Sequence, residues 1–206
     1  MITAIINQKG GVGKSSTAVH YAVWLQQRVQ SVLLIDSDAQ GSSSLWAKSL
    51  GLTVITETDP NELAENIPDW SKGYQRVVID GAGGLSETTR VILYYANVAL
   101  IPCQPTALDL LSSGSVVKLV KQAQRFRSDL QGATFINRAI PRTRLARETE
   151  EALADIEGIT HLQTMIYQRQ CVADAFGQNQ TVFDMGNVGA KSAQEYNALF
   201  NEVDAL

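Results

Sequence analysis

The stretch Asn-Gln-Lys-Gly-Gly-Val-Gly-Lys-Ser-Ser-Thr, residues 7–17, decides the fold of this chain of 206 residues. An apolar run at residues 2–6 precedes it and predicts a short buried strand, while residues 18–25 follow with apolar side chains at helical spacing. A strand, a glycine-rich turn and a helix in this order are the context that a phosphate-binding loop requires. The glycines allow successive backbone N–H groups to point into one concavity, to which the helix N-terminus adds its positive end.

Two side chains of this loop are expected to contact a bound nucleoside triphosphate. Lys14 would reach the β- and γ-phosphates, and the hydroxyl of Ser15 would take one position on Mg²⁺. The pattern departs from the plain G-x-x-x-x-G-K-[ST] form, because Gln8 replaces the first glycine and a second lysine, Lys9, precedes the others. The alternative, a glycine turn with two solvated lysines, is disfavoured because the flanking strand and helix fall where the motif needs them.

The Lys-Gly-Gly-Val-Gly-Lys-Ser arrangement of residues 9–15 resembles the deviant Walker A box of the ParA/MinD family of ATPases. The resemblance implies that Lys9 crosses a dimer interface and touches the nucleotide held by the other subunit, so that Lys9 and Lys14 both serve catalysis. Asn137, at the exit of a predicted strand, resembles the adenine-contacting position of the family, with a turn-forming asparagine as the alternative. The implied cofactors are ATP and Mg²⁺, and the implied nucleotide site comprises Lys9, Gly10, Gly11, Val12, Gly13, Lys14, Ser15, Ser16 and Asn137.

Two further apolar runs end in an acid. Residues 31–36 and 75–80 are typical of parallel strands buried on both faces, and carboxylates at such strand ends lie beside the ligand crevice of an open sheet. Residues 36–40 resemble the D-x-D-P-Q box of the family, with Ala39 in place of proline. By that resemblance Asp38 positions or activates water and Asp36 supports the metal, whereas Asp80 resembles a Walker B aspartate that holds Mg²⁺ through water. The alternative for residues 36–42 is an Asx-rich turn that caps the next helix.

The rest of the chain alternates between segments with the apolar spacing of a helix and short apolar runs typical of strands. We expect helices at 42–50 (with Leu45, Trp46 and Leu50 facing inward), 86–95, 107–126, 145–156 and 192–203, and strands at 52–55, 98–102, 133–137 and 164–166. Residues 57–66 predict a polar connection with about one turn of helix, and the glycine-rich residues 81–84 predict a flexible switch loop. This order predicts a doubly wound, mostly parallel α/β sheet with helices on both faces, a P-loop NTPase-like single domain over residues 1–206.

Composition and cysteine spacing argue against several classes of protein. The chain is 45% hydrophobic and 18% charged, and no apolar run approaches the roughly 20 residues that cross a bilayer. No secretory leader is expected, and the distant Cys103 and Cys171 suit a cytoplasmic protein rather than an iron–sulfur reductase. Because the C-terminal tail is not basic, a MinD-like membrane anchor is not expected. A small-molecule synthetase of the dethiobiotin type, or a MinD-like positioning protein without an anchor, stays open as an alternative.

One region suggests nucleic-acid binding. Between residues 118 and 147 the chain has eight basic residues and one acid, although its net charge is −4. A solvated helix face is the alternative, but ParA-type proteins bind DNA non-specifically as ATP-loaded dimers, and two copies of a modest patch would reinforce each other. The residues expected to touch DNA are Lys118, Lys121, Arg125, Arg138, Arg142, Arg144 and Arg147.

The resemblance covers nearly the whole chain and implies a cellular role. Residues 168–170, 181–184 and 189–191 resemble the tail of the small ParF-like partition ATPases, and the McdA-like carboxysome-positioning branch is the other candidate. The expected protein forms an ATP-dependent homodimer on nucleoid DNA. It positions a plasmid or a protein organelle such as the carboxysome when an adaptor, ParB-like or McdB-like, stimulates ATP hydrolysis.

Overall fold

The computed structural model describes residues 1–84 and 86–206, and it leaves out the side chains of residues 107, 108, 110 and 111. The strands are β1 (Ile2–Asn7), β2 (Val32–Asp36), β3 (Thr53–Thr56), β4 (Arg76–Gly83), β5 (Val98–Cys103), β6 (Gln131–Ala139), β7 (Thr160–His161) and β8 (Ile166–Tyr167). The helices are α1 (Lys14–Gln26), α2 (Ser42–Ser49), α3 (Pro60–Gly73), α4 (Glu87–Tyr95), α5 (Ala107–Gln124), α6 (Arg144–Ala154), α7 (Gln170–Gly177) and α8 (Gly186–Asp204).

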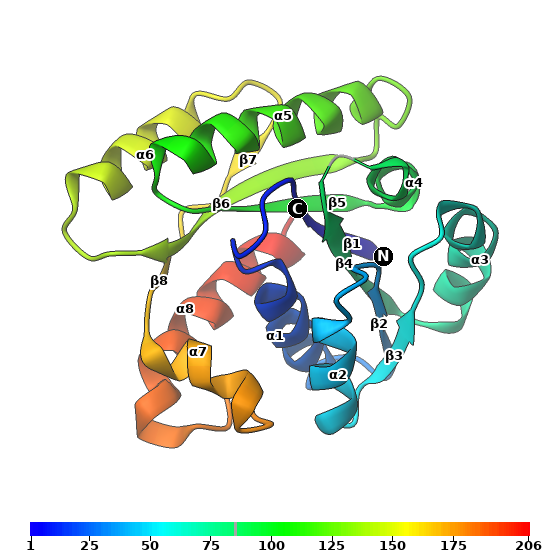
Figure 1. The fold of residues 1–206 in the computed structure, drawn as a ribbon, viewed down its shortest axis with the longest axis horizontal. Helices are drawn as coiled ribbons and strands as arrows, with labels where there is room; N and C mark the ends of the chain where they lie inside the picture. Colours follow the sequence, from blue (N-terminus) through cyan, green and yellow to red (C-terminus); the bar gives the residue numbers. More distant parts are fainter. Residues whose placement is uncertain (85) are drawn as a thin grey trace.

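The strands form one parallel sheet in the order β3-β2-β4-β1-β5-β6-β7, with β8 paired to β6. Helices α1, α2, α7 and α8 lie on one side of it and α3, α4, α5 and α6 on the other, as Figure 1 shows. Strand β1 lies between β4 and β5, so at this point neighbouring strands of the sheet are not consecutive in the chain. Ligands of doubly wound sheets bind at such switch points, beyond the carboxyl ends of the strands. The expected α/β fold class is confirmed.

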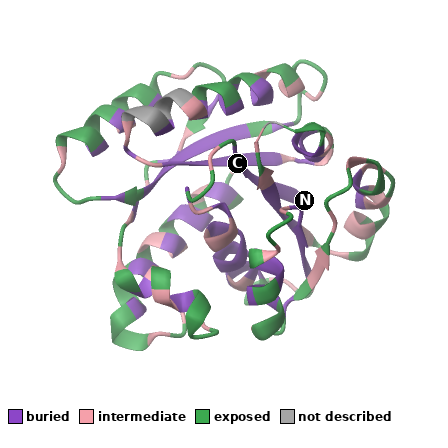
Figure 2. Cartoon of the chain, viewed as in Figure 1, coloured by how far each residue is buried: buried purple, intermediate pink, exposed green. Residues whose placement is uncertain are grey.

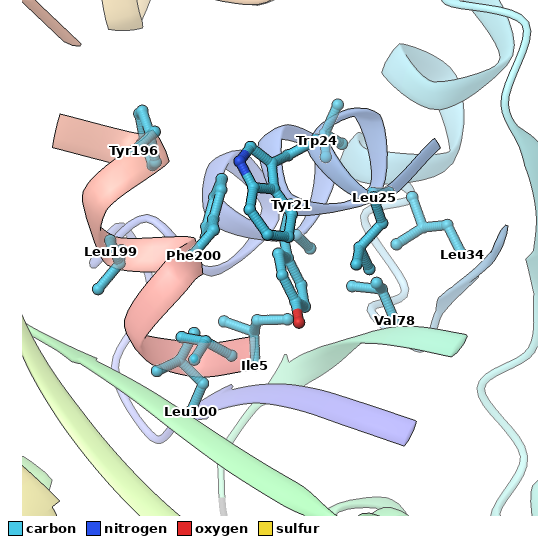
Figure 3. Close-up of a cluster of buried hydrophobic side chains, with 14 of the residues drawn as sticks. Ile5, Tyr21, Trp24, Leu25, Leu34, Val78, Leu100, Tyr196, Leu199 and Phe200 are labelled. Atoms are coloured by element: carbon cyan, nitrogen blue, oxygen red, sulfur yellow. The ribbon is translucent and has the colours of Figure 1, made fainter. Parts of the chain in front are cut away.

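Both faces of the central strands are buried (Figure 2), which explains their continuous apolar runs. Alternate residues of β1 point to opposite faces of the sheet and join different hydrophobic cores. Ile5 packs beneath α1 and α8, whereas Ala4 and Ile6 pack beneath α4 and α5. The core on the α1 side is aromatic, and the rings of Tyr21 and Phe200 lie 4.9 Å apart (Figure 3). The first helix, which follows the glycine-rich loop, is therefore packed against α8 and the sheet.

Several sequence-based expectations need correction. The polar connection expected at 57–66 is wrong, because α3 runs over 14 residues; Asp59 caps it by accepting hydrogen bonds from Asn61 N and Glu62 N, and Leu63 and Ile67 anchor it in the core. Helix α7 was not expected, and α8 begins six residues earlier than expected. The inward position expected for Leu45 is also wrong, since 64% of this residue is exposed, whereas Trp46 is buried and Leu50 packs against the core.

The loop expected directly after Asp80 is wrong as well. Residues 81–83 continue β4, where Gly83 pairs with Asn7 of β1. A Cβ atom at Gly81 would lie 2.9 Å from the carbonyl oxygen of Ile5, so the glycine serves a close approach of two strands rather than a flexible loop.

A buried histidine joins α1 to the C-terminal part of the chain. The Nδ1 atom of His20 lies 2.7 Å from the carbonyl oxygen of Ser16, and its Nε2 accepts a hydrogen bond from Val182 N at 3.2 Å. The imidazole stacks on Tyr196 with a 4.5 Å centroid separation. These contacts suit only the neutral ring with its proton on Nδ1, because a proton on Nε2 would face the Val182 N–H. Burial lowers the pKa of His20 to about 4.

We expect His20 to make the protein less stable as the pH falls. The unfolded chain binds a proton near the ordinary histidine pKa of about 6.5, whereas the folded chain does so only near pKa 4. The unfolded state therefore holds more protons in this window, and stability should drop by about 2 kcal/mol between roughly pH 7 and pH 5. Urea unfolding followed by circular dichroism measures this drop. The drop in stability should be smaller in His20→Gln. It should persist in His161→Gln, because the ring of His161 is only half-buried in the wild type. An equal dependence of stability on pH in the two variants would contradict the assignment to His20.

Candidate nucleotide-binding site

The glycine-rich loop connects β1 to α1 at the switch point of the sheet. Gly11 and Gly13 have positive φ values of 78° and 95°, a region that glycine adopts without strain. A Cβ atom on Gly13 would lie 2.2 Å from the Nδ2 atom of Asn137, so this position admits no side chain. The first turn of α1 begins with Thr17 N donating to Gly13 O at 2.9 Å. The loop thus presents the N-terminus of a helix with 13 residues, as the sequence predicts.

Two asparagines, one on β1 and one on β6, hold this loop in shape. Asn7 donates from Nδ2 to Pro102 O at 2.7 Å and accepts from Lys9 N at 3.1 Å. Asn137, at the end of β6, donates from Nδ2 to Val12 O at 2.7 Å. Asn137 therefore holds the loop in shape and also lines the adjoining pocket, which is compatible with the adenine contact proposed for it.

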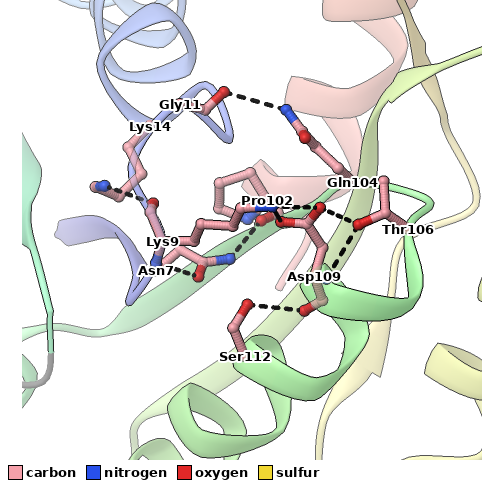
Figure 4. A network of polar contacts seen from close by, with 9 residues as sticks. All are labelled: Asn7, Lys9, Gly11, Lys14, Pro102, Gln104, Thr106, Asp109 and Ser112. Atoms are coloured by element: carbon pink, nitrogen blue, oxygen red, sulfur yellow. Dashed lines mark hydrogen bonds and ion pairs between the residues drawn. The ribbon is translucent and has the colours of Figure 1, made fainter.

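The two lysines of the loop lie in different surroundings (Figure 4). Lys14 is buried and donates to the carbonyl oxygen of Lys9 at 3.3 Å; burial lowers its pKa, while Asp80 and then Asp38 favour its charged form. The Lys9 ammonium instead reaches the outer side of the loop, where it lies 2.9 Å from the buried carboxylate of Asp109 at the start of α5. One lysine therefore points back into the loop, and the other forms an ion pair with α5.

Asp109 is a residue that the sequence analysis missed. Its backbone N–H donates to Thr106 Oγ1 at 3.1 Å, and its carboxylate accepts from the same hydroxyl. Gln104 in the same segment donates to Gly11 O at 3.1 Å. The Thr-x-x-Asp spacing of residues 106–109 is a capping signal that marks the start of α5, but nothing in the sequence connects it to Lys9.

Asp36 and Asp80 lie side by side on adjacent strands, since Asp36 of β2 is paired in register with Asp80 of β4, and Asp38 follows two residues after Asp36. Asp36 accepts from Asp38 N at 3.1 Å and from Ser44 N at 2.7 Å, so it caps α2, as the alternative interpretation proposed. Asp38 is half-buried and accepts from Gln40 N at 3.0 Å. Ser37 links the two strand ends by donating to Asp80 O at 2.8 Å.

Asp80 differs from the other two because it is fully buried and neither carboxylate oxygen has a hydrogen-bond partner within hydrogen-bonding distance among the described residues. Burial raises its pKa to about 7, against the opposing effect of the nearby hydroxyls of Ser15 and Ser43. Such a buried, unpaired carboxylate next to a hydroxyl suits a hard divalent cation with oxygen ligands. Within residues 1–84 and 86–206 no three His, Cys, Asp or Glu side chains cluster, so Mg²⁺ would need hydroxyl, water and phosphate oxygens as well.

A pocket of 580 Å³ adjoins the loop and is large enough for a nucleoside. Gly13, Ser16 and Asn137 form its inner end, and the aromatic rings of Trp46 and Phe176 stand 5.8 Å apart on its wall. Arg138, which the sequence analysis grouped with DNA-binding residues, also lines this pocket. The pocket thus offers both apolar contacts, from the aromatic wall, and polar contacts, from Arg138, which a base and a ribose would need.

The other basic residues separate into two groups, because α5 and β6 run in opposite directions. Lys118 and Lys121 lie on the last turns of α5, and Arg125 directly follows this helix, near the strands' amino ends. Arg142 lies in the loop between β6 and α6, and Arg144 and Arg147 lie at the start of α6, near the carboxyl ends, where the three line a hollow together with Glu150. Arg144 is paired with Glu148 at 2.6 Å, so acids of α6 partly neutralise this second group.

Comparisons with known proteins agree with this geometry. Residues 3–182 match the family model described as the CobQ/CobB/MinD/ParA nucleotide binding domain. The chain is 27% identical to maintenance of carboxysome distribution protein A of Halothiobacillus neapolitanus, over 97% of this chain and 94% of the other. It is 26% identical to the chromosome-partitioning ATPase Soj of Thermus thermophilus, with coverages of 98% and 94%.

Solved structures show the same fold. Apo McdA from Cyanthece superimposes with a TM-score of 0.80 at 14% identity, over 98% of both chains. The cell division protein MinD of Aquifex aeolicus gives 0.78 at 16% identity, over 100% of this chain and 97% of that one. In the described part of this chain, no helix is both long and apolar enough to span a bilayer.

We expect Asp80→Asn to stabilise the nucleotide-free protein while removing its response to metal. The substitution removes a buried, unpaired charge, so the melting temperature should rise by roughly 2–10 °C, or about 1–3 kcal/mol. Adding MgATP should raise the melting temperature of the wild type, whereas the variant should show little further rise. The matched control is Asp69→Asn, an exposed aspartate paired with Lys72, which should behave like the wild type. A destabilised Asp80→Asn that still responds fully to MgATP would contradict the proposed role.

Proposed function

The chain belongs to the CobQ/CobB/MinD/ParA family of nucleotide-binding domains, and on this premise we propose that it is a ParA-type ATPase that positions a cargo through cycles of ATP-dependent dimerisation. Its relatives include proteins named for carboxysome distribution and for chromosome partitioning. The cofactors are ATP and Mg²⁺. The observation that carries the proposal is the unpaired, buried carboxylate of Asp80 beside Lys14, on the strand that pairs with β1 and so lies next to the glycine-rich loop.

Each polar group at this site has a distinct task. The backbone N–H groups of residues 10–15 and the ammonium of Lys14 bind the phosphates, and Lys14 is already desolvated there. Mg²⁺, when bound, neutralises charge on the phosphate oxygens, and Ser15, Asp80 and, in support, Asp36 are the residues that would hold it. Asp38 is half-buried beside Lys14, and its free lone pairs can orient the attacking water.

Lys9 acts across a dimer interface in this proposal. Its ammonium lies on the outer side of the loop and 40% of its side chain is exposed, so it can leave Asp109 for the phosphates of a facing subunit. The dimer would then bury two nucleotides between two copies of the carboxyl edge of the sheet. The cargo is a plasmid, chromosome or protein organelle, and an adaptor protein stimulates hydrolysis.

Non-specific binding to DNA would hold the ATP-loaded dimer on the nucleoid. Arg142, Arg144 and Arg147 are the better-placed basic group, because they lie near the carboxyl edge where two subunits would meet. Two copies of the group would then lie side by side in the dimer. Lys118, Lys121 and Arg125, at the opposite edge, would lie far from the interface.

We expect Asp38→Ala to bind MgATP but to hydrolyse it at most at one hundredth of the wild-type rate, since the water is no longer oriented. It should accumulate as an ATP-bound dimer, which light scattering detects, while phosphate release measures turnover. Lys14→Ala should fail earlier and lose most nucleotide binding. Wild-type turnover in Asp38→Ala would remove this residue from the mechanism.

The trapped dimer offers a clean test of Lys9. In the Asp38→Ala background, Lys9→Ala should bind ATP almost normally and remain a monomer. Because the loss of Lys9 leaves Asp109 buried without its partner, Lys9→Ala combined with Asp109→Asn serves as the stability control. If that combination still forms the ATP-bound dimer, Lys9 only stabilises α5 and does not act across the interface.

We expect the ATP-loaded dimer to bind duplex DNA without sequence preference and with strong salt dependence. Each neutralised phosphate contributes about −0.9 to the slope of log K against log salt. Replacing Arg142, Arg144 and Arg147 by alanine should weaken binding to all sequences alike and reduce the slope by roughly 2–5. Fluorescence anisotropy with MgATP measures both.

The matched control is Lys118→Ala with Lys121→Ala, which removes charge from the opposite edge and should change the slope less. Light scattering verifies that both variants still dimerise. If wild-type dimer at low salt has no affinity for duplex DNA, the nucleoid role is wrong and a metabolic ATPase becomes the better interpretation.

A further inference from the structure

A groove of 460 Å³ lies between the last turns of α4 and α5, away from the nucleotide site. Leu93, Leu119 and Ala123 form its apolar floor, and Tyr94 and Phe126 flank it. Helix α4 leads into β5 and α5 leads into β6, so the groove sits at the amino ends of the strands (Figure 1). The phosphate-binding loop follows the carboxyl end of β1, on the opposite edge. This groove therefore belongs to a different surface from the ATP site.

The two aromatic side chains at the rim are unusually exposed. Phe126 is 87% exposed and Tyr94 is 58% exposed, whereas Leu93 and Leu119 beneath them are buried. Folding does not bury the ring of Phe126, so its apolar surface brings the isolated chain no stability. Exposed aromatic side chains over a hollow apolar floor are typical of surfaces that bind another molecule.

The charges of the rim are positive. Arg90 and Arg125 are exposed, and among the described residues neither makes an ion pair. Arg127 is paired with Asp129 at 2.7 Å and also donates to the Tyr94 carbonyl oxygen, so it fixes the wall of the groove. Since the whole chain has a net charge of −4, this rim is a local exception that would attract an acidic partner.

We propose that the groove binds an acidic peptide segment of a partner protein, which inserts one bulky apolar side chain between Tyr94 and Phe126. The floor accepts a leucine or an aromatic ring, and acidic neighbours pair with Arg90 and Arg125. Duplex DNA fits less well, because a phosphate backbone has no group that fills an apolar hollow. As the groove is remote from the phosphate loop, binding should be the same with and without ATP.

Selection from a phage library of random dodecapeptides tests this proposal without a known partner. The wild-type chain is the bait, and the double variant Arg90→Glu, Phe126→Ser is used to deplete peptides that bind elsewhere. Enriched sequences should combine acidic residues with a leucine or an aromatic residue. Synthetic labelled copies should bind the wild type with equal affinity with and without MgATP in fluorescence anisotropy.

Each single variant, Arg90→Glu or Phe126→Ser, should weaken that binding by about tenfold or more. The controls are Lys48→Glu and Leu45→Ser, exposed residues of α2 on the other side of the sheet, which should leave affinity unchanged. Equal binding to the groove variants, or enrichment of basic or wholly polar peptides, would overturn the proposal. So would duplex DNA binding or self-association of the chain that Phe126→Ser alone abolishes, because either would assign the groove to another occupant.

Discussion

The buried carboxylate of Asp80 is the constraint on which the rest of the structure depends. A carboxylate without a hydrogen-bond donor is costly in a protein interior, and here burial raises the pKa of Asp80 to about 7. The surroundings relieve this cost only in part, through the hydroxyls of Ser15 and Ser43 and the ammonium of Lys14. If Asp80 holds Mg²⁺ as we propose, the cation would relieve this cost further, and the energy that destabilises the free protein would be recovered when metal and nucleotide bind. The fold would thereby favour the loaded state.

A second buried acid controls the outer side of the loop. Asp109 has no exposure, and Lys9 is the cation that compensates it. Lys9 can move toward a facing subunit only if Asp109 finds another partner or loses its charge, because an unpaired buried charge costs several kcal/mol. The proposed action of Lys9 across a dimer interface would therefore be coupled to the start of α5, and through α5 to the rest of that side of the sheet. The same pair holds the Lys9 ammonium at Asp109, whereas Lys14 donates to the Lys9 carbonyl oxygen inside the loop.

The sequence predicted what depends on local pattern. The sequence placed the glycine-rich loop, the buried strand that ends in Asp36, the start of the strand that contains Asp80 and the helix capped by Ser86 correctly, because turn chemistry and apolar periodicity act over a few residues. It failed where long-range contacts decide. The glycine run after Asp80 is strand because β1 lies against Gly81, and Asp109 gains its importance only from Lys9, which is 100 residues away. Asp59 and Pro60 form a clear helix start, but the polar composition of residues 57–66 is also typical of a connection, so the sequence alone did not predict the length of α3.

Topology also explains why charge counted along the chain differs from charge on the surface. Residues 118–147 appear as one basic run, but α5 ends at the amino edge of the sheet and β6 returns to the carboxyl edge, so the run is divided between two surfaces. Arg138 goes to the nucleotide pocket, and Arg144 is held by Glu148, which stands just beyond the counted window. What remains at the amino edge surrounds an apolar groove, whereas what remains at the carboxyl edge adjoins the surface through which we propose that two subunits meet. The two edges would then be able to engage different partners at once, since neither surface would have to be released for the other to bind.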